Sequence, residues 1–486
     1  MAFMRRRCFI GGIGGLAASA TGAALLPTVS AFAAQPMARP NFLFMLSDDQ
    51  NWDGLSVAMD PRIENSRSPV VETPSLAALA AQGMRFSQAY APAPVCSPTR
   101  ASLQTGKSPA QLRWTKAGPP VHGAKLLTPL SPRHLDGREI TIAEILRAGG
   151  YATAHYGKWH LGGGGPEAHG YDESDGDTDN RHAAPFTAPN PVDIFGMGER
   201  AIDFMKRMRD TGQPFFVQMS YNALHFPQNA LPETIRKYRR KMGGNNMRAI
   251  SQAALAENLD TGIGQLLAEL DRLGLAGNTY VIFMSDNGGD AGGKNRPLRG
   301  GKGALYEGGI RVPFIMRGPG IAPGSTCDLP VIGFDLLPTV MRLAGTSGVL
   351  PHGAEGGDFS HLLAGADDPV KRPREELVFH FPHYQAEAPH SALRLGDFKL
   401  IRFYENGGLA LYDLSRDLGE KDDLAKSMPE KAAELNRRLE AHLAEVGAVL
   451  PMANPHYDPE RAPSRQQWQG IPQRPRSGRR QRPRRN

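Results

Sequence analysis

Apolar runs with strand-like composition alternate with amphipathic helical patterns through most of the chain. The short runs have the length of buried strands, whereas the longer segments repeat their apolar residues at helical spacing. Strands are predicted at 41–47, 151–157, 214–223 and 278–289, and helices at 141–150 and 249–275. This alternation predicts an α/β domain with a mostly parallel central sheet flanked by helices.

The pattern changes after about residue 376. Short apolar segments at 393–404 and 409–417 are separated by a turn at 406–408 and predict antiparallel strands. A strongly amphipathic segment, 429–446, predicts a closing helix. We therefore predict a large α/β domain over 34–375. A smaller C-terminal α+β subdomain over 376–460 is expected to hold a short antiparallel sheet and the closing helix.

The first 33 residues resemble an export signal. A basic start at 5–7 precedes a weakly apolar Gly/Ala run and a small-residue cleavage signal at 31–33. Residues 6–9 are similar to a twin-arginine signal, which is read by a folded-protein export pathway. The alternative, an uncleaved membrane anchor, is disfavoured because Pro27 and the many small residues make a poor spanning helix. We expect a periplasmic or secreted protein with no stable membrane insertion after signal removal.

The formal net charge of +7 comes from the two ends of the chain. The signal contributes three arginines and residues 471–486 contribute seven, without any acidic residue in either segment. The remaining 46 basic and 49 acidic residues leave the body of the protein at −3. The Arg/Pro-rich tail, 461–486, is predicted to be disordered, and no nucleic-acid partner is expected for an exported protein.

Polar side chains follow the predicted strands at the points where they end. In open parallel sheets, ligands bind beyond the carboxyl ends of the strands, so these side chains are expected to meet at one edge. Four of them offer hard oxygen ligands suited to Ca²⁺, or alternatively Mg²⁺, and no Cys/His spacing suits Zn²⁺. These four are Asp48, Asp49, Asp286 and Asn287. Taken alone, each pair is better explained as a turn or a helix cap, so the metal prediction depends on the set.

Basic and nucleophilic candidates accompany these oxygens. They are Cys96, Arg100, Lys158, His160, His225 and Lys302. Taken singly, each basic residue could be a surface lysine or a packed histidine. Together with a hard cation they suit a doubly charged tetrahedral oxyanion ester, either phosphate or sulfate. Cys96 is the candidate nucleophile, although a plain thiolate is a soft neighbour for Ca²⁺.

The segment CSPTR, residues 96–100, fits the C-x-P-x-R signature of the type I sulfatases of the alkaline-phosphatase-like superfamily. Further segments resemble that family in the same order: LSDDQ, GYATAHYGKWHLG, SYNALHFP, VIFMSDNGG and GGKGALYEGGIRVP. The resemblance spans roughly residues 38–450. It implies a sulfuric ester hydrolase of the arylsulfatase and carbohydrate sulfatase group, acting on a sulfated small molecule or glycan.

The resemblance also implies the site. In this family the cysteine is oxidised to formylglycine by a formylglycine-generating or equivalent maturation enzyme, so residue 96 would be modified. The metal ligands carried over are Asp48, Asp49, Asp286, Asn287 and residue 96. The hydrated aldehyde would attack sulfur and form a covalent sulfo-enzyme, activated by the metal and Arg100. Lys158, His225 and Lys302 would hold the sulfate or protonate the leaving alcohol, and His160 would help to expel the sulfate.

Substrate recognition is expected from the segment 379–394, where His380 and His383 are candidate substrate ligands on an aromatic rim. Packing against the sheet is the alternative for these histidines. Two departures from the family pattern could alter substrate contacts, namely Phe226 after His225 and Lys107 in place of the usual arginine.

Two rival functions are open on the sequence. The first is a phosphate or phosphonate monoesterase on the same scaffold, since sites for the two oxyanions differ little in charge. The second is a non-catalytic glycan-binding protein in which Cys96 is an unmodified thiol or forms a disulfide with Cys327.

Overall fold

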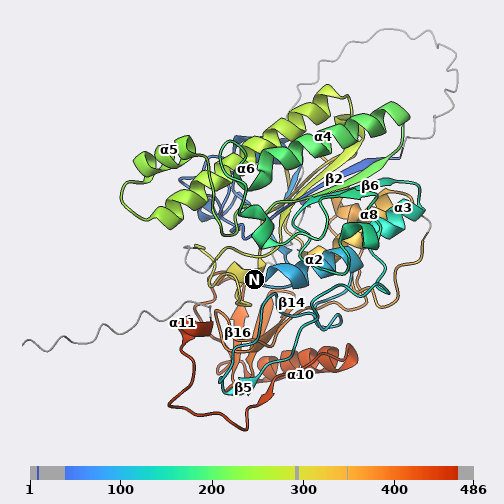
Figure 1. Ribbon diagram of the computed structural model, residues 1–486. Helices are drawn as coiled ribbons and strands as arrows, with labels where there is room; N and C mark the ends of the chain where they lie inside the picture. Colours follow the sequence, from blue (N-terminus) through green and yellow to red (C-terminus); the bar gives the residue numbers. More distant parts are fainter. Residues whose placement is uncertain (1–7, 10–38, 291–294, 347, 469–486) are drawn as a thin grey trace, which may run out of the picture.

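The computed structural model describes residues 8–9, 39–290, 295–346 and 348–468. A nine-stranded, mostly parallel sheet carries helices on both faces, and a smaller antiparallel sheet with its own helix lies beside it (Figure 1). This arrangement confirms the predicted fold class.

The strands of the large sheet run in the order β1-β11-β3-β10-β9-β2-β8-β6-β7. The neighbours from β9 to β7 are parallel, whereas β10 is antiparallel to both β9 and β3. Their bounds are Cys8–Phe9 (β1), Asn41–Ser47 (β2), Met84–Phe86 (β3), Ala152–Gly157 (β6), Glu173–Ser174 (β7), Phe215–Ser220 (β8), Thr279–Ser285 (β9), Phe314–Arg317 (β10) and Ser325–Cys327 (β11). The four predicted strands are therefore β2, β6, β8 and β9.

Strand β2 lies in the middle of the sheet and is buried along its whole length. Its alternate side chains enter two different cores, because successive residues of a strand point to opposite faces. Leu43 and Met45 belong to one core, and Phe42, Phe44 and Leu46 to the other. Burial on both faces explains why the strand reads as a continuous apolar run.

Helices cover both faces of this sheet (Figure 1). The first face carries α1 (Pro74–Gln82), α4 (Ile194–Thr211) and α6 (Met247–Arg272), with α5 (Pro232–Met242) packed on α6. The second face carries α2 (Cys96–Thr105), α3 (Ile142–Ala148) and α8 (Leu336–Leu343). The predicted segment 249–275 is thus one helix. Thr141 caps α3 with a reciprocal capping box to Glu144, as its sequence favours.

The C-terminal sheet is antiparallel, in the order β13-β14-β15-β16. Its strands are Leu377–Phe381 (β13), His390–Leu395 (β14), Phe398–Phe403 (β15) and Leu409–Asp413 (β16), and α10 (Pro429–Glu445) covers one face. The opposite face packs Phe379 and Ile401 against Leu305 and Ile310 of the large domain. The glycine-rich segment that carries Lys302 is therefore held between the two sheets.

Apart from six short 3-10 helices, the remaining elements of the described chain are short strands and helices. They are β4 (Ala89–Tyr90), β5 (Leu126–Leu127), β12 (Val331–Ile332), β17 (Met452–Ala453), α7 (Glu307–Ile310), α9 (Ser360–Leu363) and α11 (Arg465–Trp468). Strand β12 pairs with β4 and β17 pairs with β5. Among the helices of the described ranges, none has the length and apolar character that crossing a membrane demands.

Both predicted terminal segments fall largely outside the described residues. Of the predicted export signal, only Cys8 and Phe9 are described, as β1 beside β11. The predicted tail begins within the described chain, where residues 465–468 form α11, and its residues 469–486 lie outside it.

Candidate active site

The carboxyl ends of four neighbouring parallel strands bring the predicted site residues to one edge of the large sheet. Strand β2 ends before Asp48 and Asp49, and β9 ends before Asp286 and Asn287. Lys158 follows β6, His225 follows β8, and Cys96 is the first residue of α2. Backbone hydrogen bonds join these ends: Asp48 N donates to Ala223 O at 2.8 Å, and Lys158 N donates to Ser220 O at 2.7 Å.

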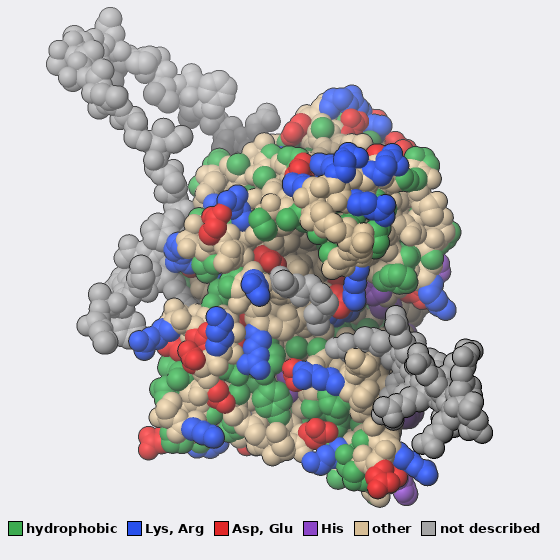
Figure 2. All heavy atoms as spheres, turned by 90° about the vertical axis from the view of Figure 1, so that its left-hand side faces the viewer, with side chains coloured by type: hydrophobic (Ala, Val, Ile, Leu, Met, Phe, Trp, Pro, Cys, Tyr) green, Lys and Arg blue, Asp and Glu red, His purple; other side chains and the backbone are tan. Residues whose placement is uncertain are grey.

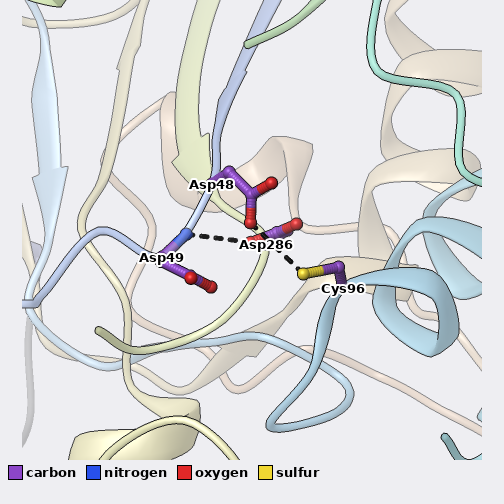
Figure 3. Close-up of side chains that lie close together, drawn as sticks. All are labelled: Asp48, Asp49, Cys96 and Asp286. Atoms are coloured by element: carbon purple, nitrogen blue, oxygen red, sulfur yellow. Dashed lines mark hydrogen bonds between the residues drawn. The ribbon is translucent and has the colours of Figure 1, made fainter. Parts of the chain in front are cut away.

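Three carboxylates and the Cys96 sulfur form a tight cluster at this edge (Figure 3). One ligand atom from each of Asp48, Asp49, Cys96 and Asp286 lies within 4.8 Å of the others, and all four residues are buried. Cys96 Sγ lies 3.2 Å from Asp48 Oδ1, and Asp49 N donates to Asp286 Oδ1 at 3.3 Å. Asp49 has φ +57°, a left-handed conformation that is uncommon outside glycine and turns its carboxylate into the same cluster as that of Asp48.

The amide side chain of Asn287 bears on whether this cluster can bind a metal ion. Its Nδ2 donates to Asp49 Oδ1 at 2.7 Å and to Gly288 O, while its Oδ1 is buried and has no hydrogen-bond partner among the described residues. An unsatisfied buried acceptor costs about 1–3 kcal/mol. A divalent cation would satisfy that oxygen, and three carboxylates with an amide oxygen are the hard donor set that Ca²⁺ and Mg²⁺ prefer. The residues present fit such a cation.

Arg100 connects two of these strand ends. It lies one helical turn after Cys96 on α2 and is 2 % exposed. Its Nε and Nη2 donate to Asp286 Oδ2 at 3.0 and 2.8 Å, and its Nη1 donates to Lys158 O at 2.6 Å. The guanidinium therefore fixes the carboxylate after β9 and the backbone after β6 relative to the nucleophile candidate.

Two lysines add positive charge. The Lys158 ammonium forms an ion pair with Asp48 Oδ2, and both side chains are fully buried. Lys302 Nζ lies 2.7 Å from Asp49 Oδ1 and 3.4 Å from Cys96 Sγ. Burial acts to raise the pKa of Asp48, but the charges of Lys158, His225 and Arg100 hold that pKa well below its usual value. Burial likewise opposes the charged form of Lys302, yet the nearby Asp49 raises its pKa well above the ordinary value.

The two histidines of the site are favoured in their neutral form. His160 is largely buried, its Nδ1 has no hydrogen-bond partner in the described chain, and burial together with Lys158 and Arg100 lowers its pKa to about 2. Burial also lowers the pKa of His225. Its Nδ1 lies 2.6 Å from Phe226 O, and its Nε2 lies 3.4 Å from Asn180 Nδ2. A neutral imidazole can accept a proton, which is the chemistry required of a general base.

Cys96 itself is only 1 % exposed. Burial first, and then the charges of Asp286 and Asp48, raise the pKa of its thiol well above the usual value. No disulfide joins the described Cys96 and Cys327. Cys327 lies instead in β11, opposite Phe86 of β3. The structure thus lacks the Cys96–Cys327 bond that one rival function invoked.

A pocket of about 970 Å³ opens above this cluster. Its walls include Asp49, Cys96, His160, His225 and Lys302 from the predicted site. On the face shown in Figure 2, basic, acidic and histidine side chains gather in the hollow between the upper and lower parts of the molecule. The pocket is large enough for a substrate with a ring attached to its anionic group.

His380 and His383 lie away from this pocket. His380 Nδ1 lies 2.6 Å from Ser391 Oγ and its Nε2 lies 3.1 Å from Val449 O, within the packing of the small sheet. His383 Nε2 lies 2.7 Å from Thr115 Oγ1. Both side chains are buried and neither lines the pocket. Their predicted contact with substrate therefore has no support in this arrangement, and the alternative of packing against the sheet describes them better.

Other residues line the pocket without having been predicted as ligands. They include Lys116, His122, Arg248, Gln385 and Trp468. Of the two departures from the family pattern, Phe226 lines the pocket and is 78 % exposed, whereas Lys107 pairs with Glu139 at 2.5 Å outside it. No local motif marks Lys116 or Trp468, because their position depends on contacts between distant parts of the chain.

Comparisons with known proteins agree with the geometry. A family model described as Sulfatase matches residues 40–346, and a model of the C-terminal part of N-sulphoglucosamine sulphohydrolase matches residues 301–448. Arylsulfatase A of Bos taurus is 31 % identical over 463 residues, covering 81 % of this chain and 85 % of its own length. An ulvan-active sulfatase of Formosa agariphila is 29 % identical over 452 residues, covering 84 % and 82 %. The crystal structure of Ps i-CgsB in complex with k-i-k-neocarrahexaose aligns with a TM-score of 0.69 at 24 % identity, covering 83 % of this chain and 93 % of that one.

Proposed function

The chain belongs to the sulfatase family and is an enzyme that hydrolyses sulfate esters, and we propose that it acts on a sulfated carbohydrate through a modified residue 96 and a bound divalent cation. The observation that carries the proposal is the meeting of Cys96, three buried carboxylates and Lys302 in one pocket. The sequence signature at 96–100 supports the modification of residue 96, and the cluster of carboxylate oxygens supports the bound cation.

The cation would be held by Asp48, Asp49, Asp286 and Asn287, together with residue 96. Ca²⁺ is the cation we favour, with Mg²⁺ as the alternative, because all the protein donors apart from residue 96 are hard oxygens. When bound, it would act as a Lewis acid that neutralises charge on the reacting oxygens. The Oδ1 of Asn287, which has no hydrogen-bond partner among the described residues, supports this assignment without any reference to the family.

Residue 96 is proposed to be formylglycine in the working enzyme, made from Cys96 by a maturation enzyme. Its hydrated aldehyde would supply one hydroxyl to attack sulfur and a second through which the sulfate is expelled. The buried, protonated character of the Cys96 thiol is in keeping with a side chain that needs conversion before it can act.

The neighbouring side chains have roles that follow from charge and position. Lys158 and Lys302 place two ammonium groups beside the cluster and would bind the negatively charged sulfate oxygens. Arg100 holds Asp286 in place. His160 and His225, which are favoured as neutral imidazoles, would accept protons from the hydroxyls of residue 96, and a proton taken up in this way would pass to the leaving alcohol.

A carbohydrate substrate is supported by the chemistry of the relatives. One relative is named an ulvan-active sulfatase, another an N-acetylgalactosamine-6-sulfatase, and a structural neighbour holds a neocarrahexaose. The resemblance of residues 1–33 to a twin-arginine signal supports a periplasmic or secreted enzyme, which would meet such polymers outside the cytoplasm.

Mass spectrometry of the peptide that contains residue 96 tests the modification directly. Conversion of cysteine to formylglycine lowers the peptide mass by about 18 Da, because the side chain gains oxygen and loses H₂S. The same preparation is assayed for sulfate release from 4-nitrophenyl sulfate, with Cys96→Ala as the inactive control. Full activity in a preparation whose residue 96 is entirely unmodified cysteine would overturn the proposal.

Turnover of 4-nitrophenyl sulfate and 4-nitrophenyl phosphate then ranks the two ester types on one leaving group. A preference for phosphate of about a hundredfold, or roughly 2.7 kcal/mol of transition-state discrimination, would replace the sulfatase assignment with a phosphatase. A panel of sulfated monosaccharides and disaccharides, scored by sulfate release, identifies the sugar and the position that the enzyme accepts.

A further inference from the structure

Lys116 lines the same pocket as Cys96 but takes no part in the cluster around it. Only 8 % of the residue is exposed, so its aliphatic stem is packed into the wall. Among the described residues, its Nζ donates one hydrogen bond, to Tyr384 O at 2.8 Å. An ammonium group has three N–H donors, so this contact leaves two for a ligand.

The charge on Lys116 is uncompensated within the described part of the chain. Other cations of the pocket have carboxylate partners, since Lys302 pairs with Asp49 and Arg248 pairs with Asp290. No ion pair of Lys116 is found among the described residues, and burial alone lowers its pKa to about 8. A buried cation without a partner is costly, and an anion that entered the pocket would remove that cost.

Lys116 and an aromatic side chain of the pocket wall, Trp468, contact the same residue. The carbonyl that receives the Lys116 hydrogen bond belongs to Tyr384, whose ring centroid is 4.7 Å from that of Trp468. Trp468 lines the pocket from α11. Arg465 anchors that helix by donating to Ala386 O at 2.6 and 2.9 Å. Aromatic rings next to a charged donor suit a sugar ring that carries an anionic group.

We propose that Lys116 and Trp468 form a second anion subsite, which binds a carboxylate or a second sulfate on the substrate while the scissile sulfate lies at residue 96. The inference rests on the proposed function, because it assigns this pocket to a sulfated sugar. It narrows the substrate class to carbohydrates with at least two anionic groups, one cleaved and one retained. Trp468 stacks on the ring that carries the retained group.

Turnover of matched substrates tests the subsite. The probes are 4-nitrophenyl sulfate and N-acetylgalactosamine 6-sulfate, each with one anion, and two ligands with a second anion. A chondroitin 6-sulfate disaccharide supplies a carboxylate as its second anion, and D-glucosamine-2-N,6-O-disulfate supplies a second sulfate. Comparing these two ligands shows which of the two anions the subsite binds. Lys116→Met should reduce kcat/KM on at least one two-anion substrate about tenfold to a hundredfold more than on 4-nitrophenyl sulfate.

Two variants control for structure. Lys116→Arg keeps the positive charge and should recover most of the loss. Lys125 is an exposed lysine that also donates to a backbone carbonyl, Glu405 O at 3.1 Å, but does not line the pocket. Lys125→Met should therefore change kcat/KM equally for one-anion and two-anion substrates. Equal losses on all substrates with Lys116→Met, or no loss on any of them, would overturn the subsite.

Binding without turnover separates this inference from the proposed function. In the full chain carrying Cys96→Ala, calorimetry compares N-acetylgalactosamine 6-sulfate with the two-anion ligands, with and without Lys116→Met. A tighter dissociation constant for a two-anion ligand, abolished by Lys116→Met and weakened by Trp468→Ala, supports the subsite even if no sulfate is released by the parent enzyme. Equal affinity for one-anion and two-anion ligands, or no binding of either, contradicts it.

Discussion

Arg100 makes a two-point contact with a single oxygen of Asp286: its Nε and Nη2 both donate to Oδ2, at 3.0 and 2.8 Å. The other oxygen, Oδ1, accepts from Asp49 N at 3.3 Å and faces the cluster. Arg100 thus holds one oxygen of the Asp286 carboxylate and leaves the other free to serve as the proposed metal ligand. Because Arg100 and Cys96 lie on the same face of α2, one helix turn positions both the proposed nucleophile and a candidate metal ligand.

Arg100→Lys should lower kcat/KM for sulfate release by about a hundredfold to a thousandfold, since one ammonium cannot reproduce the fork that holds Asp286. Steady-state kinetics with 4-nitrophenyl sulfate measure the effect. Arg372→Lys is the matched control, because Arg372 makes a similar buried fork to Asp335 at 2.9 and 2.6 Å outside the pocket. A comparable loss of kcat/KM in the control would show that Arg100 acts only through stability.

Added calcium should raise the melting temperature of the full chain. A ligand present at a hundred times its dissociation constant stabilises the native state by about 2.7 kcal/mol. Asn287→Ala should reduce this gain, because it removes the amide oxygen that lacks a partner in the described chain. Asn245→Ala, at an exposed position, should leave it intact. An unchanged calcium response in Asn287→Ala would remove that residue from the ligand set.

Lys302→Met should lower kcat for sulfate release by about a hundredfold or more, because it deletes a cation that lies 3.4 Å from the Cys96 sulfur. Lys302→Arg, which keeps the charge, should retain more activity than Lys302→Met. Single-turnover kinetics separate chemistry from binding. Lys241→Met removes an exposed lysine that pairs with Glu72 and provides the surface control. Equal activity of Lys302→Met and the parent enzyme would exclude a role in the reaction.

Acid should destabilise the protein partly through His390. Burial, with a smaller effect from Lys399, lowers the pKa of this histidine to about 3, and its neutral ring accepts from Leu305 N at 2.8 Å and donates to Ala388 O at 2.7 Å. The unfolded chain binds a proton near pH 6.5 that the folded ring does not. The contribution of neutral His390 to the free energy of unfolding is therefore complete above about pH 6.5. It is lost as the pH falls toward 3, by up to about 1.4 kcal/mol per pH unit.

Melting temperatures between pH 7.5 and 4.5 test this dependence. His390→Gln retains an acceptor for Leu305 N but cannot titrate, so its melting temperature should fall less steeply with acid than that of the parent. His352→Gln, at an exposed position, is the control and should follow the parent curve. Parallel curves for His390→Gln and the parent would contradict the assignment.

Lys399→Met should destabilise the contact between the two sheets. The Lys399 ammonium lies 2.9 Å from carboxylate oxygens of both Glu307 and Glu420, and all three side chains are unexposed. Removing it leaves Glu420 without this cation and leaves Glu307 with Arg311 alone at 3.4 Å, at a cost of about 3–5 kcal/mol. Lys431→Met breaks a partly exposed pair with Glu434 and should cost less than about 1 kcal/mol. Thermal unfolding of the two variants measures the difference, and equal losses would refute it.

Much of the fold and of the central cluster was accessible from the amino-acid pattern. Residues 42–46 are apolar at every position because β2 is buried on both faces, and Asp48 and Asp49 follow directly after the strand ends. Polar residues after β6, β8 and β9 could be placed together in advance, since parallel strands end at a common edge. The assignment of Cys96 depended further on the signature that it forms with Arg100.

The pocket walls could not be derived in the same way. His380 and His383 lie in a segment of aromatic and polar residues that suits a substrate rim, yet their rings contact Ser391, Val449 and Thr115 in the interior. A strand places alternate side chains on opposite faces, but the sequence does not show which face another layer covers. Here the small sheet is covered by α10 on one side and by the large domain on the other.

The sequence by itself determined the alternation of strands and helices, the strand ends that carry Asp48 and Asp286, and the motif around Cys96. These are local properties, set by periodicity over a few residues. Tertiary structure alone decided that Lys116 meets Tyr384, 268 residues further along the chain, and that Trp468 packs on the same tyrosine. Such contacts depend on how separately formed layers dock, and the free energy of docking is spread over many apolar residues instead of being encoded at the two that meet.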